Sequence, residues 1–399
     1  CHGTSVVSRP LYDMPSPSRT NRSRDLRFDT LRGLLVLFMA MNHIESDVRV
    51  ITSQTFGFIS SAEGFVFMSG LVAGWVYSRK LHERGADAAR AATRRRAGEV
   101  FRMHLLTYLA TFVWMVLFVL MTTEVPHLLP WLFAADPWVA LALAPTLIYQ
   151  PGLLDILPMY CVFLFMLPLA LRAVAQGKSA LVLMISLTLW TCGQFFRDPI
   201  IAAGGIINLG AFNILAWQLL FFGGAVLGGH KALGTRLIEP RPGFIALAFG
   251  ATIYLTLVRH GVLPPPLPAE QMADLTRKTV LAPLRLLNFA LVAYLVAVGA
   301  TLFPRAFSWR PLALLGQHTL AVFSAHVVVA MVILTYPDLF FYTPAGRWTA
   351  TGLMFVTLFA TALVSRWRRD RDIRRAIVQV TRAAPPPTRP DPDWIATAR

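Results

Sequence analysis

Long apolar segments recur along this chain and predict an all-α, polytopic integral membrane protein. A helix rises about 1.5 Å per residue, so roughly 17–25 mostly apolar residues are enough to cross the hydrocarbon core of a bilayer. About ten segments have this character, and each is expected to form a transmembrane helix. They are 31–48, 57–78, 103–122, 153–171, 179–196, 210–229, 243–259, 280–303, 311–335 and 348–365.

The apolar segment 126–148 is ambiguous because prolines interrupt it. Pro126, Pro130, Pro137 and Pro145 each remove a helical hydrogen bond. The segment could be a re-entrant or interfacial hairpin. If instead it crosses the membrane, the orientation of every later span is reversed.

Composition agrees with the pattern of apolar segments. Of the 399 residues, 55% are hydrophobic and 15% are charged, and the mean hydropathy is +0.55. A soluble protein of this size carries more charge. We expect a disordered segment at 1–24, a membrane domain at 25–375 and a cytoplasmic, proline-rich tail at 376–399.

The net charge of +16 reflects membrane topology better than nucleic-acid binding. With the N-terminus inside, 30 of the 37 Lys and Arg residues fall on the inner side and 7 on the outer side. This asymmetry follows the positive-inside rule, so both termini are expected in the cytoplasm. No nucleic-acid partner is predicted. The three cysteines show no metal-ligand spacing, so no metal site is predicted either.

Arg32 and His43 lie eleven positions apart in the first span, and therefore on nearly the same helix face, about 16 Å apart. Ionisable groups within a bilayer are costly and usually face a protein interior or a wet cavity. The pair predicts a polar passage with a cation at its inner end. Asp29 and Arg32 could be a simple interfacial ion pair, or Asp29, Arg32 and Arg102 could receive a phosphate-bearing donor.

Glu63 lies in the second span at a depth similar to that of His43, because the two spans form a tight hairpin. A carboxylate beside an imidazole fixes its tautomer and raises its basicity. Our hypothesis is that Glu63 orients His43 as a catalytic general base. Alternatively, Glu63 is protonated and hydrogen-bonded locally, or it pairs with Arg285.

Four further polar residues are candidates for binding a hydroxyl-rich acceptor: Gln150, Asp155, Gln218 and His326. Each also has a structural interpretation. Asp155 could cap a helix N-terminus, Gln218 could join two helices, and His326 could be a buried, hydrogen-bonded histidine. Because no Gly-x-Ser-x-Gly elbow is present, an enzyme of this sequence would use direct attack by an activated hydroxyl.

Several stretches resemble the OpgC family, inner-membrane proteins that succinylate osmoregulated periplasmic glucans. The stretches are RDLRFDTLRG at 24–33, NH at 42–43, FGFISSAEGFVFMSG at 56–70, YQPG at 149–152, DILP at 155–158 and WQ at 217–218. The spacing from Arg32 to His43 also looks like that of the wider acyltransferase-3 group of membrane acyltransferases.

The resemblance implies a membrane-bound O-acyltransferase of the bacterial inner membrane. It implies an acyl-CoA donor, most directly succinyl-CoA, as a cytoplasmic co-substrate, with no bound cofactor, and a periplasmic glucan as the acceptor. The alternative is a transporter or flippase that moves an anionic acyl or glycan substrate without acyl transfer. The acyl group, the glucan linkage and the oligomeric state are not predicted.

Overall fold

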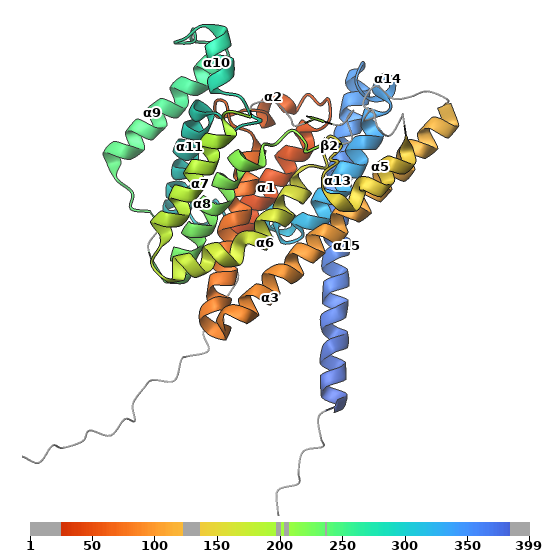
Figure 1. Ribbon diagram of the computed structural model, residues 1–399. Helices are drawn as coiled ribbons and strands as arrows, with labels where there is room; N and C mark the ends of the chain where they lie inside the picture. The colour runs from red at the N-terminus through yellow and green to blue at the C-terminus, as the bar shows by residue number, and fades with distance from the viewer. Residues whose placement is uncertain (1–24, 123–135, 197–200, 203–206, 236–237, 384–399) are drawn as a thin grey trace, which may run out of the picture.

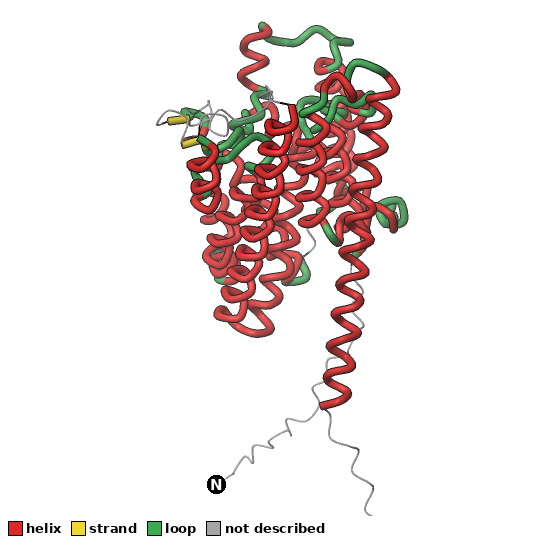
Figure 2. The backbone as a smooth tube through the Cα atoms, turned by 90° about the vertical axis from the view of Figure 1, so that its right-hand side faces the viewer, coloured by secondary structure: helices red, strands yellow, loops and turns green. Residues whose placement is uncertain are grey.

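The computed structural model describes residues 25–122, 136–196, 201–202, 207–235 and 238–383. These residues are mainly helical, as predicted, with one short antiparallel hairpin of β1 (Ile201–Ala202) and β2 (Ile207–Asn208) (Figure 2). The helices are α1 Leu26–Asn42, α2 Arg49–Thr52, α3 Ser61–Thr122, α5 Pro137–Leu143, α6 Ile156–Ala175, α7 Ser179–Gly193, α8 Ile214–Ala232, α9 Pro242–Arg259, α10 Ala269–Leu275, α11 Pro283–Leu302, α12 Arg310–Gln317, α13 Thr319–Leu334, α14 Pro337–Phe340 and α15 Pro344–Ala383.

A described helix overlaps each of the ten predicted spans, but not all of these helices have the length and composition of a span. Five of the described helices qualify, and a sixth qualifies if the bent pair α12 and α13 is counted as one. The five are α3, α6, α9, α11 and α15. The chain is therefore a helical membrane protein, while ten crossings and cytoplasmic termini stay predictions.

The second and third predicted spans belong to one 62-residue helix, α3, which is kinked at Gly85. Gly85 has a φ of 82°, a backbone conformation that glycine adopts at little steric cost. Figure 1 shows α3 turning at the lower end of the molecule and climbing again. The basic stretch between the two predicted spans is thus helical.

Glycines allow α3 and α8 to pack with their backbones in contact. A Cβ added at Gly70 would lie 2.0 Å from the carbonyl oxygen of Phe221, and one at Gly228 would lie 2.1 Å from that of Leu71. Small residues at the interface permit such close approach between membrane helices. Because α3 also packs against α6, these three helices form much of the core.

The ninth predicted span is broken into α12 and α13, which meet at an angle of 86°. Helix α12 packs directly on α1: a Cβ at Gly33 would lie 1.9 Å from the carbonyl oxygen of Leu312, and one at Gly316 would lie 1.8 Å from that of Asp29. After the break, α13 runs towards the end of α1. The break therefore positions residues of α13 beside His43.

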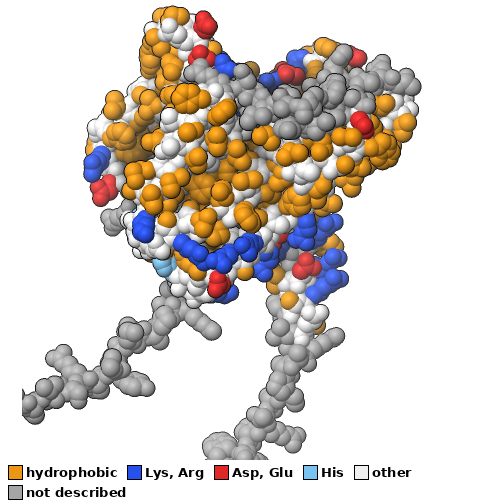
Figure 3. Space-filling model, in the orientation of Figure 1, with side chains coloured by type: hydrophobic (Ala, Val, Ile, Leu, Met, Phe, Trp, Pro, Cys, Tyr) orange, Lys and Arg blue, Asp and Glu red, His pale blue; other side chains and the backbone are white. Residues whose placement is uncertain are grey.

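The surface separates into an apolar middle and a basic end (Figure 3). Large apolar side chains such as Leu109, Phe165 and Val356 are exposed on the helices, as expected for surfaces that face lipid. Lys and Arg side chains gather at the lower end in Figure 3, around the turn of α3 and on α15. Helices α2, α10 and α14 lie at the opposite end (Figure 1).

Two segments are described only in part. Helix α15 continues to Ala383, past residue 375, and the predicted division into a membrane domain and a tail stays a prediction. Within 126–148, the described helix α5 has seven residues, too few to cross a bilayer. The predicted disorder at 1–24 and the rest of the proline-rich tail lie outside the described residues.

Candidate active site

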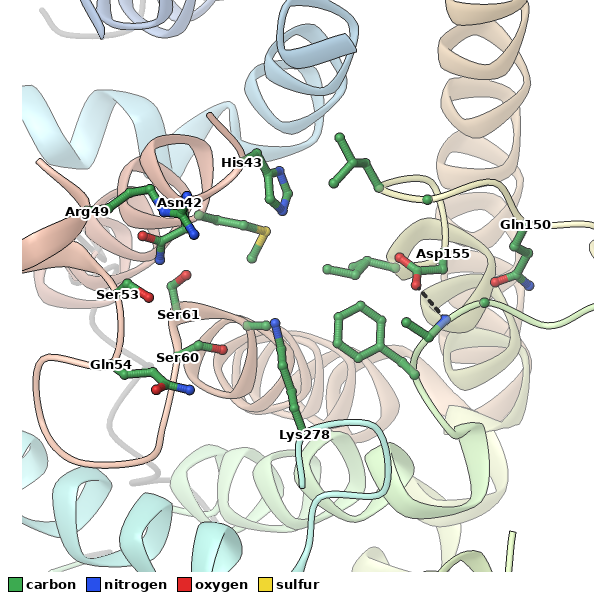
Figure 4. A pocket seen from close by; sticks show the side chains of 18 of the residues that line it. Asn42, His43, Arg49, Ser53, Gln54, Ser60, Ser61, Gln150, Asp155 and Lys278 are labelled. Atoms are coloured by element: carbon green, nitrogen blue, oxygen red, sulfur yellow. Dashed lines mark hydrogen bonds between the residues drawn. The ribbon is translucent and has the colours of Figure 1, made fainter. Parts of the chain in front are cut away.

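A cavity of about 560 Å³ opens among the ends of α1, α2 and α3, the loop before α6, the β2 loop and the loop from α10 to α11. Figure 4 shows its labelled polar side chains gathered around a common space. They are Asn42, His43, Arg49, Ser53, Gln54, Ser60, Ser61, Gln150, Asp155 and Lys278. The lining includes Arg49 of α2 and Asn208 of β2, and both elements lie at the upper end of the molecule in Figure 1, away from the basic end in Figure 3.

His43 lines the cavity and contacts a second histidine. Its Nδ1 lies 3.0 Å from Nε2 of His326, and the two rings stack with centroids 5.1 Å apart. His326 comes from α13 and is fully buried, with its ring edge-on to Phe323. Because Nδ1 of His43 is engaged, its Nε2 is the nitrogen left for a substrate.

His43 lies at the end of α1 rather than within a longer helix. The first span was expected to continue to residue 48, but α1 ends at Asn42. The Asn42 side chain donates to the carbonyl oxygen of Thr52 at 3.0 Å and accepts from the Thr52 hydroxyl at 2.8 Å. These bonds fold the chain into α2, so His43 faces the cavity from the helix end.

Glu63 does not contact His43, and the alternative pairing with Arg285 is the one found. Its Oε1 forms a buried ion pair with Nε of Arg285. Its Oε2 accepts from the backbone N–H and the hydroxyl of Ser60, at 2.9 and 2.6 Å. The bond to the Ser60 N–H is one half of a capping box, in which a residue three positions into a helix reaches back to the N-cap. His326 takes the place beside His43 that was expected for Glu63.

Lys278 is a cavity residue that the sequence reasoning missed. Its side chain extends from the α10–α11 loop towards the space below His43 (Figure 4). A signal was present in the sequence, because Lys278 is one of the few cations expected on the outer side. Arg49 lines the same cavity, and Arg285 lies behind it at Glu63.

Asp155 and Gln150 line the cavity opposite the end of α1, and their part in binding an acceptor stays a prediction. Asp155 accepts a hydrogen bond of 3.0 Å from the N–H of Ala211. Gly210 has a φ of 80°, and a Cβ there would lie 2.5 Å from Cβ of Asp155. Only glycine therefore lets the β2 loop approach this carboxylate so closely.

Two predicted acceptor residues are placed elsewhere. The amide of Gln218 donates to the carbonyl oxygens of Ser186 and Leu215, at 2.7 and 3.1 Å. Gln218 thus joins α8 to α7, and its donors are already used. His326 is fully buried behind His43, and it is not among the residues that line the cavity.

The three predicted donor-binding residues do not line the cavity either. Asp29 is buried where α1 contacts Gly316. Arg32 donates to the hydroxyl of Thr319 at 2.5 Å, at the start of α13. Arg102 is exposed on α3. Their part in binding a donor stays a prediction, and the structure does not bring all three to one pocket.

The arrangement is suited to proton transfer at a polar group that enters the cavity. An imidazole whose second nitrogen is held by a buried partner can act as a general base. Within the described part of the chain, no group of three His, Cys, Asp or Glu side chains is placed to hold a metal ion.

Comparison with known protein families identifies most of the chain. Residues 24–371 match the family described as OpgC protein. Comparison with curated proteins gave no significant match, and comparison with solved structures gave none either. The family match covers nearly the whole described helical region, including every residue that lines the cavity. The chain belongs to the OpgC family.

Proposed function

We propose that this protein transfers an acyl group, most directly succinyl, from a CoA thioester supplied on the cytoplasmic side to hydroxyl groups of a periplasmic glucan. Membership of the OpgC family indicates an acyltransferase-like role in glucan modification. The observation that carries the proposal is the pair of His43 and His326, which presents a held imidazole to a polar cavity.

The proposed chemistry is a direct transfer with His43 as general base. Nε2 of His43 takes the proton of a glucan hydroxyl while the hydroxyl oxygen attacks the thioester carbonyl carbon. The carbon–sulfur bond then breaks, an ester forms, and the proton passes to the thiolate to give free CoA. With Nδ1–H of His43 donating to Nε2 of His326, the tautomer that leaves Nε2 unprotonated is stabilised.

The rest of the cavity supports an acceptor that is rich in hydroxyls. Hydroxyl, amide and carboxylate residues, namely Ser53, Ser61, Gln150 and Asp155, line the same space. A sugar ring presents donors and acceptors in many directions, so a site for it needs both kinds of group. In the proposal, the donor phosphates stay near the basic end, where Arg32 and Arg102 are the predicted contacts.

The direct test measures transfer by the purified protein in proteoliposomes, with radiolabelled succinyl-CoA and an unmodified glucan. Wild type is expected to label the glucan. His43→Ala is expected to reduce kcat by roughly 10²–10⁴-fold, the usual contribution of general base catalysis. His260→Ala is a matched control, because His260 is exposed at the end of α9, away from the cavity.

Two outcomes would contradict the proposal in different ways. Wild-type rates in the His43→Ala variant would remove His43 from the chemistry. Movement of glucan or acyl compounds across the membrane with no change in glucan mass would favour the transporter. Both are read by mass spectrometry of the glucan and by counting label in each compartment.

A further inference from the structure

Lys278 differs from the other described cations that are predicted for the outer side, because each of those has a side-chain partner. Arg197, also predicted there, lies outside the described residues. Four arginines form ion pairs with carboxylates, and Arg259 donates to Gln54. The four pairs are Arg49–Glu45, Arg277–Asp274, Arg285–Glu63 and Arg347–Asp47. Among the described residues, Lys278 forms no ion pair or hydrogen bond through its ammonium, which lies over the ring of Phe212 at 5.3 Å.

The loop that carries Lys278 is held rigidly by side chains from three helices. Trp217 donates to the carbonyl oxygens of Lys278 and Thr279, at 3.2 and 3.0 Å. Three more side-chain donors bind the carbonyl oxygens of neighbouring loop residues: Arg285 on Thr276, Gln194 on Val280 and Trp190 on Leu281. The backbone of Lys278 is therefore fixed, as is required of a group that must recognise a ligand.

The surroundings of the Lys278 ammonium leave it available for an anion. Burial lowers the pKa of Lys278, and the carboxylates of Glu63 and Asp155 act in the opposite direction. Neither carboxylate is free, because Glu63 is held by Arg285 and Ser60 and Asp155 accepts from Ala211. The Lys278 side chain is nonetheless exposed to the cavity, and an ammonium there without a direct partner can form a charge-assisted hydrogen bond with a ligand that brings a negative charge.

The lining near Lys278 also has the character of a site for a short chain. Met39, Leu153, Ile156 and Phe212 contribute apolar surface to the same cavity as His43. A chain of a few methylene groups could occupy this surface with one end at His43 and a charged end at Lys278. Figure 4 shows Lys278 extending towards His43 across the cavity.

We propose that Lys278 is a specificity-determining residue that binds the terminal carboxylate of a dicarboxylic acyl group while the thioester carbonyl lies at His43. This inference rests on the proposed function and names the residue that selects its acyl group. A neutral acyl group such as acetyl would leave the ammonium unpaired. A carboxylate end can form a charge-assisted hydrogen bond with this exposed ammonium, and a neutral acyl group cannot, so the dicarboxylic donor is favoured.

The experiment compares succinyl-CoA with acetyl-CoA as donors to a neutral glucan, for wild type and for the variants Lys278→Gln and Lys278→Arg. Lys278→Gln is expected to lower the ratio of succinyl to acetyl kcat/KM by about 10- to 100-fold, the value of one charge-assisted hydrogen bond. The loss is expected in KM for succinyl-CoA. Lys278→Arg keeps the charge and is expected to restore part of the preference.

Arg49→Gln is the matched control, because it also removes a cation from the cavity lining but one that Glu45 already pairs. It is expected to keep the succinyl preference. If the Lys278→Gln variant does not fold, the preference for the succinyl group can still be measured on the wild-type protein. A thioether analogue of succinyl-CoA is then expected to inhibit at least tenfold more tightly than the acetyl analogue.

The outcomes separate this inference from the proposed function. Equal losses of kcat with both donors would make Lys278 a stabiliser of the reacting oxyanion and overturn its role in selection. The assay is repeated with an anionic glucan, and a loss seen only there would assign Lys278 to the acceptor and overturn the proposal. An unchanged ratio would overturn it as well. A wild-type protein that transfers neither group would overturn the proposed function itself.

Discussion

The Glu63 carboxylate makes two kinds of contact, which together hold in place two of the segments that line the cavity. One oxygen caps the start of α3 through Ser60, and the other pairs with Arg285 of α11. Arg285 in turn donates to the carbonyl oxygen of Thr276, in the loop of Lys278. Both members of the ion pair are almost fully buried, at 0% and 2% exposed, so neither charge is solvated if the other is removed.

Glu63→Gln is therefore expected to destabilise the protein, because it leaves the Arg285 guanidinium buried without a counter-charge. The expected cost is about 3–5 kcal/mol, measured as a lower thermal unfolding midpoint in detergent. The double variant Glu63→Met with Arg285→Met is expected to recover part of that loss. A Glu63→Gln variant with unchanged stability but a much lower kcat would return Glu63 to the role of orienting His43.

His326 is expected to act as a positioning residue through its bond to Nδ1 of His43. His326→Ala removes one neutral hydrogen bond, so kcat is expected to fall by up to about tenfold with little change in KM for the glucan. His326→Gln keeps a polar partner and is expected to recover part of kcat. Equal increases in KM for both variants would instead place His326 in acceptor binding.

At the scale of residues, the sequence indicated which side chains lie at the cavity better than it indicated which residues they contact. His43, Gln150 and Asp155 all line the cavity, and their roles there stay predictions. Ser60 and Glu63 have the spacing of a capping box, a local signal that was present. The contact of His43 with His326 joins residues 283 positions apart, and no pattern along the chain encodes such a contact.

At the scale of elements, the position of the site depends on where helices end and break. Apolar periodicity located the helices, since a described helix overlaps every predicted span. It did not locate the end of α1, which is set by the bonds between Asn42 and Thr52. Nor did it show the 86° break before α13. Both features arise from tertiary contacts, which override local preference.

Gly316→Ala tests the packing of α12 on α1. The added Cβ would lie 1.8 Å from the carbonyl oxygen of Asp29, so one backbone must move. Overpacking of this kind costs about 1–3 kcal/mol, and a lower thermal unfolding midpoint is expected. Gly352→Ala in α15 is the control, because a Cβ there meets nothing within 4 Å. Equal midpoints for both variants would contradict the close approach.

At the scale of the whole molecule, the cavity and the basic surface lie at opposite ends of an apolar body (Figures 1 and 3). This separation matches the predicted asymmetry of Lys and Arg between the two sides of the membrane. In the proposed orientation, α10 faces the periplasm and the end of α15 faces the cytoplasm. The glucan then meets the cavity without entering the hydrocarbon.

The orientation can be tested with single cysteines at exposed positions, after replacement of the native cysteines by alanine. In intact cells, Glu270→Cys on α10 is expected to react with a membrane-impermeant maleimide. Asp372→Cys on α15 is expected to react only after permeabilisation. The reverse labelling pattern would invert the proposed topology and place the cavity on the side of the donor.

The early end of α1 bears on how a bulky polymer can be modified at a membrane. With His43 at the terminus of the helix, the proposed function requires a long polysaccharide to place only one sugar at the rim, while its remaining units stay in bulk water. In that proposal, only the flexible thioester arm of the donor crosses the membrane. One site of this kind could decorate chains of any length or branching.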